Sequence, residues 1–181
     1  MNGLMNGKTC LITGATSGID EVAAHELDAQ GAIIVVNGRN EEKCITTVDN
    51  IKRKTGNTKV NYILADLSSQ NEVRKLASKF KTQFNELNIL INNAGVVIGN
   101  RQESVDGIKM TFAVNHISHF LLTNLLLDTI KGSAPARIIN VSSAVHSWSS
   151  INFEDLNGRK EYTAMNAYAQ SKLSNILFTY E

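Results

Sequence analysis

Thr9-Cys-Leu-Ile-Thr-Gly-Ala-Thr-Ser-Gly18 reads as a short apolar strand that runs directly into a glycine-rich turn. The residues that follow have the period of an amphipathic helix, with Ile19, Val22 and Leu27 on one side and Gly31 at the end. Glycines let such a turn bend tightly and let backbone N–H groups approach a phosphate at the helix N-terminus. A simple loop would also contain glycines, so the position between a strand and a helix is what indicates a nucleotide site.

Strands and helices alternate along the rest of the chain. We expect further strands at 32–37, 59–65, 87–91 and 137–141, and helices at 41–55, around 73–84, within 103–130 and from Thr163 to Glu181. Such alternation favours a parallel sheet with right-handed crossovers and helices on both faces. The sequence therefore predicts one doubly wound α/β domain of the Rossmann type over residues 1–181, with no internal repeat.

The composition limits the kinds of function that this chain can have. It has 181 residues, of which 43% are hydrophobic, and a formal net charge of +1, which argues against nucleic acid or an anionic membrane surface as partners. No apolar run is long enough to span a membrane, and residues 1–8 lack the apolar core of a signal peptide. We expect a cytoplasmic protein in which Cys10 and Cys44 are packed thiols rather than a disulfide or metal pair.

The end of the second expected strand indicates which dinucleotide the site would take. A site for NAD places a carboxylate there to hold the ribose 2′-hydroxyl, and residues 32–40 contain none. Arg39 offers a guanidinium instead, which suits the 2′-phosphate of NADP, although a solvated loop arginine is the alternative. The sequence therefore favours NADP(H) over NAD(H).

Tyr168 and Lys172 are four residues apart in the last expected helix, so their side chains share one face. A lysine ammonium beside a phenol favours the phenolate, which makes the hydroxyl acidic enough to exchange a proton with a carbonyl or alcohol oxygen. Such a pair also occurs by chance, so it needs support from other motifs.

Three further segments contain side chains that a ligand could meet. Asn92-Asn-Ala-Gly95 closes the fourth strand, where an asparagine turn is the alternative. Asn115 is a polar residue on the leucine-rich helix within 103–130, so it needs a partner such as a backbone carbonyl or a water. The apolar face of this helix is core, a contact in a homo-oligomer, or both. In the segment from Ala144 to Thr163, the side chains of His146, Trp148 and Phe153 either line a pocket or hold a loop down.

Together these segments resemble the short-chain dehydrogenase/reductase family, in the family's order and spacing and over nearly the whole chain. Within the family, Asn115-His116 and the long segment between Ser143 and Tyr168 are most similar to the retinol-dehydrogenase-type members. The motifs that carry the resemblance are Thr13-Gly-Ala-Thr-Ser-Gly-Ile19, Asp66-Leu67, Asn92-Asn-Ala-Gly95, Asn115, Asn140-Val-Ser-Ser143 and Tyr168-xxx-Lys172.

The resemblance implies hydride transfer between C4 of a nicotinamide and the carbinol carbon of an alcohol or carbonyl substrate. Tyr168 would be the acid/base, Lys172 would make it more acidic and hold the nicotinamide ribose, and Ser143 would polarise the substrate oxygen. Asn115 would hold a water in the proton path. The residues implied to bind the cofactor, besides Tyr168 and Lys172, are Gly14, Ser17, Gly18 and Ile19 at the pyrophosphate, Arg39 at the 2′-phosphate, Asp66 and Leu67 at the adenine end, and Asn93, Ala94 and Gly95 at the adenosine ribose.

The chain departs from the family pattern in two places. Asp20 stands where the family has a third glycine, and its carboxylate would repel a pyrophosphate by roughly 3 kcal/mol at about 5 Å and an effective dielectric of about 20. The family also continues beyond this last helix, so a chain ending at Glu181 is expected to expose its fifth strand as an edge. Two functions stay open: an NADP-dependent alcohol/carbonyl oxidoreductase, and a truncated, non-catalytic remnant that acts as a weak nucleotide-binding or protein-interaction module.

Overall fold

Five parallel strands form a single sheet in the order β3-β2-β1-β4-β5. The computed structural model describes residues 3–15 and 19–181, without the side chains of residues 19–21. The strands are β1 (Thr9–Thr13), β2 (Ile33–Gly38), β3 (Val60–Leu64), β4 (Ile89–Asn92) and β5 (Arg137–Asn140). The strands lie within two residues of the expected bounds, and the predicted doubly wound α/β fold is confirmed.

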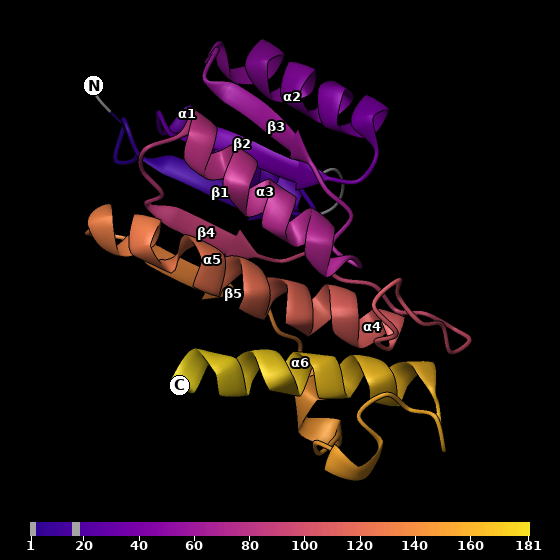
Figure 1. Ribbon diagram of the computed structural model, residues 1–181. Coiled ribbons are helices and arrows are strands. Elements are labelled where there is room, and N and C mark those ends of the chain that lie inside the picture. Colours follow the sequence, from indigo (N-terminus) through magenta and orange to yellow (C-terminus); the bar gives the residue numbers. More distant parts are fainter. Residues whose placement is uncertain (1–2, 16–18) are drawn as a thin grey trace.

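Helices connect the strands and cover both faces of the sheet, and Figure 1 shows α3 and α5 crossing one of these faces. The α-helices are α1 (Ile19–Ala29), α2 (Glu41–Thr55), α3 (Gln70–Gln83), α4 (Met110–Phe112), α5 (Ser118–Gly132) and α6 (Ala164–Tyr180). A π-helix, η1 (Ala113–Ile117), joins α4 to α5, and two 3₁₀-helices, η2 (Ala144–Trp148) and η3 (Phe153–Asp155), precede α6. Figure 1 shows α6 running alongside the α4–η1–α5 segment.

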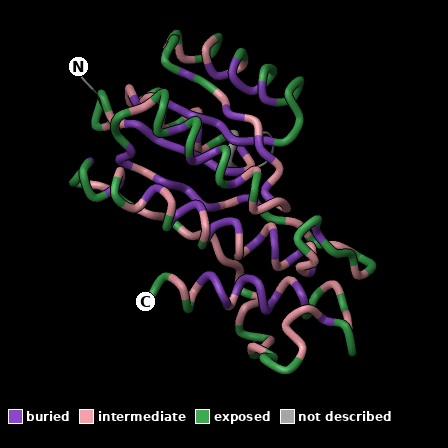
Figure 2. The backbone as a smooth tube through the Cα atoms, viewed as in Figure 1, coloured by how far each residue is buried: buried purple, intermediate pink, exposed green. Residues whose placement is uncertain are grey.

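The core forms two layers because successive strand residues point to opposite faces of the sheet. On one face α3 and α5 pack against the sheet, through Leu11, Val35, Leu90, Leu76, Phe80, Leu122 and Leu126. On the other face α1 and α2 pack against it, through Cys10, Ile12, Ile34, Val36, Ala24, Val48 and Ile51. Figure 2 shows β1, β2 and β4, the three central strands, as the most continuously buried part of the backbone.

Local capping explains where the polar helix α2 begins and ends and where α3 begins. The side chain of Asn40 accepts a hydrogen bond from the backbone N–H of Lys43, and Gly56 ends α2 in the left-handed conformation. Ser69 caps α3 in the same way, by accepting from the N–H of Glu72. The two caps therefore fix the first residues of the helices, Glu41 in α2 and Gln70 in α3.

The leucine-rich helix begins later than predicted. Residues 103–109 are not helical: Glu103 and Lys109 form an isolated antiparallel bridge, and the helix starts at Met110. Its leucines mostly pack into the core, whereas Phe120 is 47% exposed. Self-association through this helix remains a prediction.

β5 lies at one edge of the sheet, as expected, and leaves Ile139 exposed. Cys10 and Cys44 are both buried free thiols, and burial raises the pKa of Cys10 to about 12. Among the described residues, no group of three or more His, Cys, Asp or Glu could hold a metal ion. In this same part of the chain, every helix is too short or too polar to cross a membrane.

Candidate functional site

The carboxyl ends of β1, β4 and β5 meet at one edge of the sheet. In an open parallel sheet, ligands bind beyond these ends at the point where the strand order reverses. Here the reversal falls between β1 and β4, because the chain moves to β2 and β3 on one side and to β4 and β5 on the other. The segments that leave these three strands contain most of the residues that the sequence assigned to a site.

The turn after β1 is held against the loop after β4. The Thr13 hydroxyl accepts hydrogen bonds from the backbone N–H groups of Asn93 and Ala94 at 3.0 and 3.2 Å. Gly14 has a φ of +75°, and a Cβ added to it would lie 2.8 Å from the Cα of Ala94. Only glycine fits this position. Of the other residues predicted for the phosphate turn, Ser17, Gly18 and the side chain of Ile19 lie outside the described residues.

Most of the buried side chains of helix α6 are polar. Thr163 begins the helix by accepting a hydrogen bond from the N–H of Asn166. The buried polar residues of α6 are Gln170, Ser171, Lys172, Ser174 and Asn175. Positions 168, 171, 172 and 175 are three or four residues apart, so they share one face of the helix. This face of α6 contributes the side chains that form the candidate site.

Tyr168 and Lys172 lie together on this face, as their spacing predicts. The Lys172 ammonium is 5.6 Å from the centroid of the Tyr168 ring and donates a hydrogen bond to the Val141 carbonyl at 2.9 Å. Lys172 is buried, while Tyr168 is only half-buried. The Ser142 hydroxyl donates to the backbone carbonyl of Lys172, which fixes α6 against the end of β5. The phenol ring of Tyr168 therefore lies beside a positive charge that is held in place.

Asn115 joins the loop after β4 to α6. Its amide oxygen accepts from the N–H of Val96 at 2.8 Å, and its amide nitrogen donates to the Val96 carbonyl and the Ser171 hydroxyl, each at 3.0 Å. The residue is fully buried in η1, and π-helices of this kind are frequent at functional sites. The partner that the sequence required for Asn115 is therefore the Val96 backbone, with Ser171 as a second contact.

Gly95 lies between these groups. A Cβ added to it would be 3.6 Å from both the Asn115 amide oxygen and the Lys172 ammonium nitrogen. The loop after β4, the π-helix and α6 thus converge on one point, although they are far apart in the sequence. Gly95 is exposed, so a ligand at the sheet edge could reach this point.

Ser143 follows β5 and begins η2, which packs against α6. Its carbonyl accepts hydrogen bonds from the backbone N–H and the ring Nδ1 of His146, and its hydroxyl makes no cap hydrogen bond to η2. Trp148 and Phe153 are 72% and 78% exposed. These two rings therefore neither anchor the 144–163 segment in the core nor close over a pocket.

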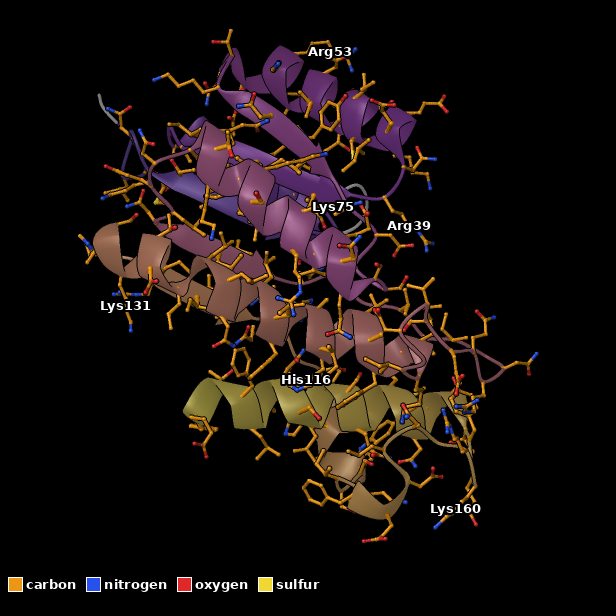
Figure 3. The ribbon with its side chains drawn as sticks, in the orientation of Figure 1. Arg39, Arg53, Lys75, His116, Lys131 and Lys160 are labelled. Atoms are coloured by element: carbon orange, nitrogen blue, oxygen red, sulfur yellow. The ribbon has the colours of Figure 1, made fainter. Side chains whose placement is uncertain are left out.

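The residues predicted for the adenosine end lie at the ends of β2 and β3. Arg39 is exposed directly after β2, and Figure 3 shows its side chain extending outward at the edge where the strands end. The Asp66 carboxylate accepts from the N–H of Ser68, in a tight turn after β3. The side chain of Leu67 is packed in the core, so it is not available to a ligand.

The sequence patterns do not single out Ser171 and Asn175, although both are buried contacts of the site. The available signal is their spacing. Ser171 follows Tyr168 by three residues and Asn175 follows Lys172 by three residues, which places all four on one helical face. Polar residues three positions after Tyr168 and after Lys172 therefore indicate the side of α6 that faces the site.

His119 is a buried histidine behind the site, and it predicts a pH dependence of stability. Burial and the nearby charges of Lys172 and His116 lower the pKa of His119 to about 3, and a contact with the Ala94 backbone opposes this shift only in part. As the pH falls through about 6.5, His119 therefore binds a proton in the unfolded chain but stays neutral in the folded chain. The neutral His119 ring therefore costs the folded state nothing above about pH 6.5, and the free energy of unfolding decreases as the pH falls from there toward 3.

We expect the free energy of unfolding of the wild type to drop by about 2 kcal/mol more between pH 7 and pH 5 than that of His119→Leu. Urea denaturation of both proteins at the two pH values measures the difference. Identical pH dependence in wild type and variant would contradict this assignment.

Comparisons with known proteins agree on one family. The sequence profile of the short chain dehydrogenases matches residues 8–181. Human retinol dehydrogenase 13 is 46% identical over 176 residues, which are 97% of this chain and 53% of that protein. The chain thus spans about half the length of the curated relatives it matches.

Solved structures show the same likeness. A protein from Mycobacterium paratuberculosis superposes with a TM-score of 0.84 at 35% identity, over 97% of this chain and 61% of that one. A short chain dehydrogenase from Shigella flexneri, solved as a complex with NADP, superposes with a TM-score of 0.77 at 26% identity, over 98% of this chain and 71% of that one.

Proposed function

Because this chain belongs to the short chain dehydrogenase family, we propose that it is an NADP(H)-dependent oxidoreductase acting on alcohol and carbonyl groups. The observation that carries the proposal is the pairing of Tyr168 with Lys172, at 5.6 Å from ring centroid to ammonium, beside the loop after β4. This pairing places a proton donor and a fixed charge where an open α/β sheet binds its ligand.

The residues present fit a nicotinamide dinucleotide. Gly95 is exposed and leaves its point of the sheet edge clear of a side chain, and Arg39 offers an exposed guanidinium at the end of β2 for a 2′-phosphate. The Shigella flexneri relative was solved with NADP, which supports NADP(H) over NAD(H) for this chain as well. When bound, the cofactor supplies or accepts a hydride at C4 of its nicotinamide.

The side chains of the site would transfer a proton to or from the substrate oxygen. In the direction of reduction, the Tyr168 hydroxyl gives its proton to the substrate oxygen as the carbonyl becomes an alcohol. The Lys172 ammonium stabilises the tyrosinate that is left, and the Val141 carbonyl keeps that ammonium in place. Ser143 would donate a hydrogen bond to the same substrate oxygen. Asn115 holds the loop after β4 in contact with α6, and a water in the proton path could be bound there.

The substrate that we propose is an apolar alcohol or carbonyl compound, with retinoids as the first class to test. The similar human protein is named for retinol, and the exposed rings of Trp148 and Phe153 offer apolar surface on the segment between Ser143 and Tyr168. A panel of aldehydes and ketones, followed by the loss of NADPH absorbance, tests both the activity and the substrate class. The alternative, a remnant without catalysis, is not favoured by the family match; it would gain support if NADPH did not bind at millimolar concentration.

Asp20 should weaken cofactor binding. It lies in the first turn of α1, the helix that follows the glycine turn, where its carboxylate would oppose a pyrophosphate. We expect Asp20→Gly to lower the Kd for NADPH by about tenfold to a hundredfold, which corresponds to roughly 1.4 to 3 kcal/mol.

Fluorescence titration and calorimetry measure these dissociation constants. Asp20→Asn separates the charge from the volume of the side chain, and Glu26→Gln removes a charge from the same helix as a control. Equal dissociation constants for wild type and Asp20→Gly would show that the carboxylate does not oppose the cofactor.

A further inference from the structure

Asn175 connects three parts of the site through one buried amide. Its nitrogen donates to the backbone carbonyl of Asn115 at 2.9 Å and to that of Val141 at 3.4 Å. Its oxygen lies 3.0 Å from Nδ1 of His116. The side chain is fully buried, so each of these contacts is made without competition from bulk water.

Two of these contacts reach groups that the proposed chemistry needs. The Val141 carbonyl also accepts the hydrogen bond of the Lys172 ammonium, so Asn175 and Lys172 share one acceptor. The Asn115 carbonyl belongs to the π-helix, where the regular helical hydrogen-bond pattern is interrupted. Asn175 therefore ties the anchor of the lysine to the backbone of the residue that holds the loop after β4.

The third contact determines which nitrogen of His116 carries the proton. With its nitrogen directed at two carbonyls, the Asn175 amide presents its oxygen to His116, so Nδ1 must donate. The opposite amide orientation would set the amide oxygen against two carbonyl oxygens and leave a donor facing the ring. Burial lowers the pKa of His116, with the Asn175 contact opposing, which favours a neutral ring with hydrogen on Nδ1.

Aromatic rings hold His116 in this position. Its ring centroid lies 5.1 Å from that of Phe112 and 6.3 Å from that of Phe178, the latter at an interplanar angle of 82°. Figure 3 shows His116 between the α4–η1–α5 segment and α6. The imidazole thus fills the contact between the two helices, with Asn175 as its polar partner.

We propose that Asn175 is a positioning residue that sets the register of α6 against the π-helix, and thereby the placement of Lys172 and Asn115, while fixing His116 in the Nδ1–H form. Its effect on turnover rests on the function proposed above. Its effect on His116 and Lys172 does not, and can be observed without cofactor or substrate.

Nitrogen NMR of the labelled full chain tests the placement. In the wild type, we expect His116 to show a protonated Nδ1 and an unprotonated Nε2. Asn175→Leu, of similar size, removes the acceptor and both donor contacts, so we expect the Nε2–H form to appear and the Lys172 ammonium signal to shift. Asn175→Asp keeps an acceptor for His116 but loses the donors, so the Nδ1 proton should persist while the Lys172 signal shifts. This second variant decides the question if Asn175→Leu does not fold.

Ser174→Ala is the matched control, because Ser174 is also buried in α6 but its hydroxyl donates to the Gln170 carbonyl of the same helix and, within the described part of the chain, to no other element. We expect it to leave both signals unchanged. Unchanged His116 and Lys172 signals in Asn175→Leu, or an unprotonated His116 Nδ1 in the wild type, would overturn the proposal.

Kinetics test the effect on turnover. We expect Asn175→Leu to lower kcat about tenfold or more with KM within about threefold, because a displaced lysine affects the chemical step more than substrate binding. Ser174→Ala should retain wild-type kcat. Full kcat in Asn175→Leu would overturn the positioning role. If the wild type itself oxidises no NADPH, the proposed function fails, and the NMR signals still decide the placement of Lys172 and His116.

Discussion

Replacing Tyr168 with phenylalanine should slow NADPH oxidation by about a hundredfold to ten-thousandfold, the range that a positioned acid/base contributes. The variant keeps the aromatic ring beside the Lys172 ammonium, so the packing of α6 and the cation–ring contact remain. What it loses is the hydroxyl proton that the substrate oxygen would receive. The Kd for NADPH should stay within about threefold of the wild-type value, because the loss falls on the chemical step.

Steady-state kinetics with the best carbonyl substrate of the panel, together with NADPH titration, measure both quantities. Tyr180→Phe is the matched control, since Tyr180 lies on the same helix but is 87% exposed. It should retain full activity. A Tyr168→Phe protein that turns over at the wild-type rate would remove Tyr168 from the mechanism.

Gly14→Ala should lower the free energy of unfolding by about 2 to 4 kcal/mol. Two effects add up here: alanine is strained in the left-handed backbone conformation, and its Cβ overlaps with the loop after β4. Gly14 has a φ of +75°, and its added Cβ would meet the backbone of Ala94 at 2.8 Å, where there is no flexible side chain to move aside. The turn after β1 and the loop after β4 would separate, so NADPH binding should weaken as well.

Gly95→Ala provides the comparison. A Cβ at that position makes only ordinary contacts, at 3.6 Å to Asn115 and Lys172, and its backbone is not left-handed. We expect a change in unfolding free energy of less than about 1 kcal/mol. Urea denaturation of both variants measures the difference, and equal stabilities would show that the approach of Gly14 to Ala94 can relax.

The strands and helices could be predicted from the sequence because their periods differ and their ends contain turn and capping residues. The Tyr168–Lys172 pairing could also be predicted, because a spacing of four on a helix is a geometric statement. The π-helix that contains Asn115 could not, since an extra residue in a helical turn leaves no mark in the hydrophobic pattern. The start of the same helix at Met110 was misplaced because residues 103–109 are held by a bridge between Glu103 and Lys109.

Contacts that depend on tertiary placement were harder to predict. Leu67 belongs to a motif assigned to the cofactor, yet its side chain lies in the core, where the position of the turn after β3 places it. Asn175 gains its significance from the Asn115 and Val141 carbonyls, which are 60 and 34 residues away in the sequence. Which carbonyl a buried amide meets is decided by the packing of α6, and this is not encoded in local spacing.

The polar interior face of α6 has a consequence for how the molecule opens. Every residue of β1 is buried and most are apolar, whereas the buried apolar residues of α6 are two alanines, Ala167 and Ala169, and its larger apolar side chains are half-buried or exposed. The attachment of this helix therefore buries less hydrocarbon per residue than the central strands do, and its hydrogen bonds add modestly because water can replace them. Sub-global unfolding should therefore release α6 before the sheet, so that Tyr168 and Lys172 reside in a segment with lower local protection than the central strands.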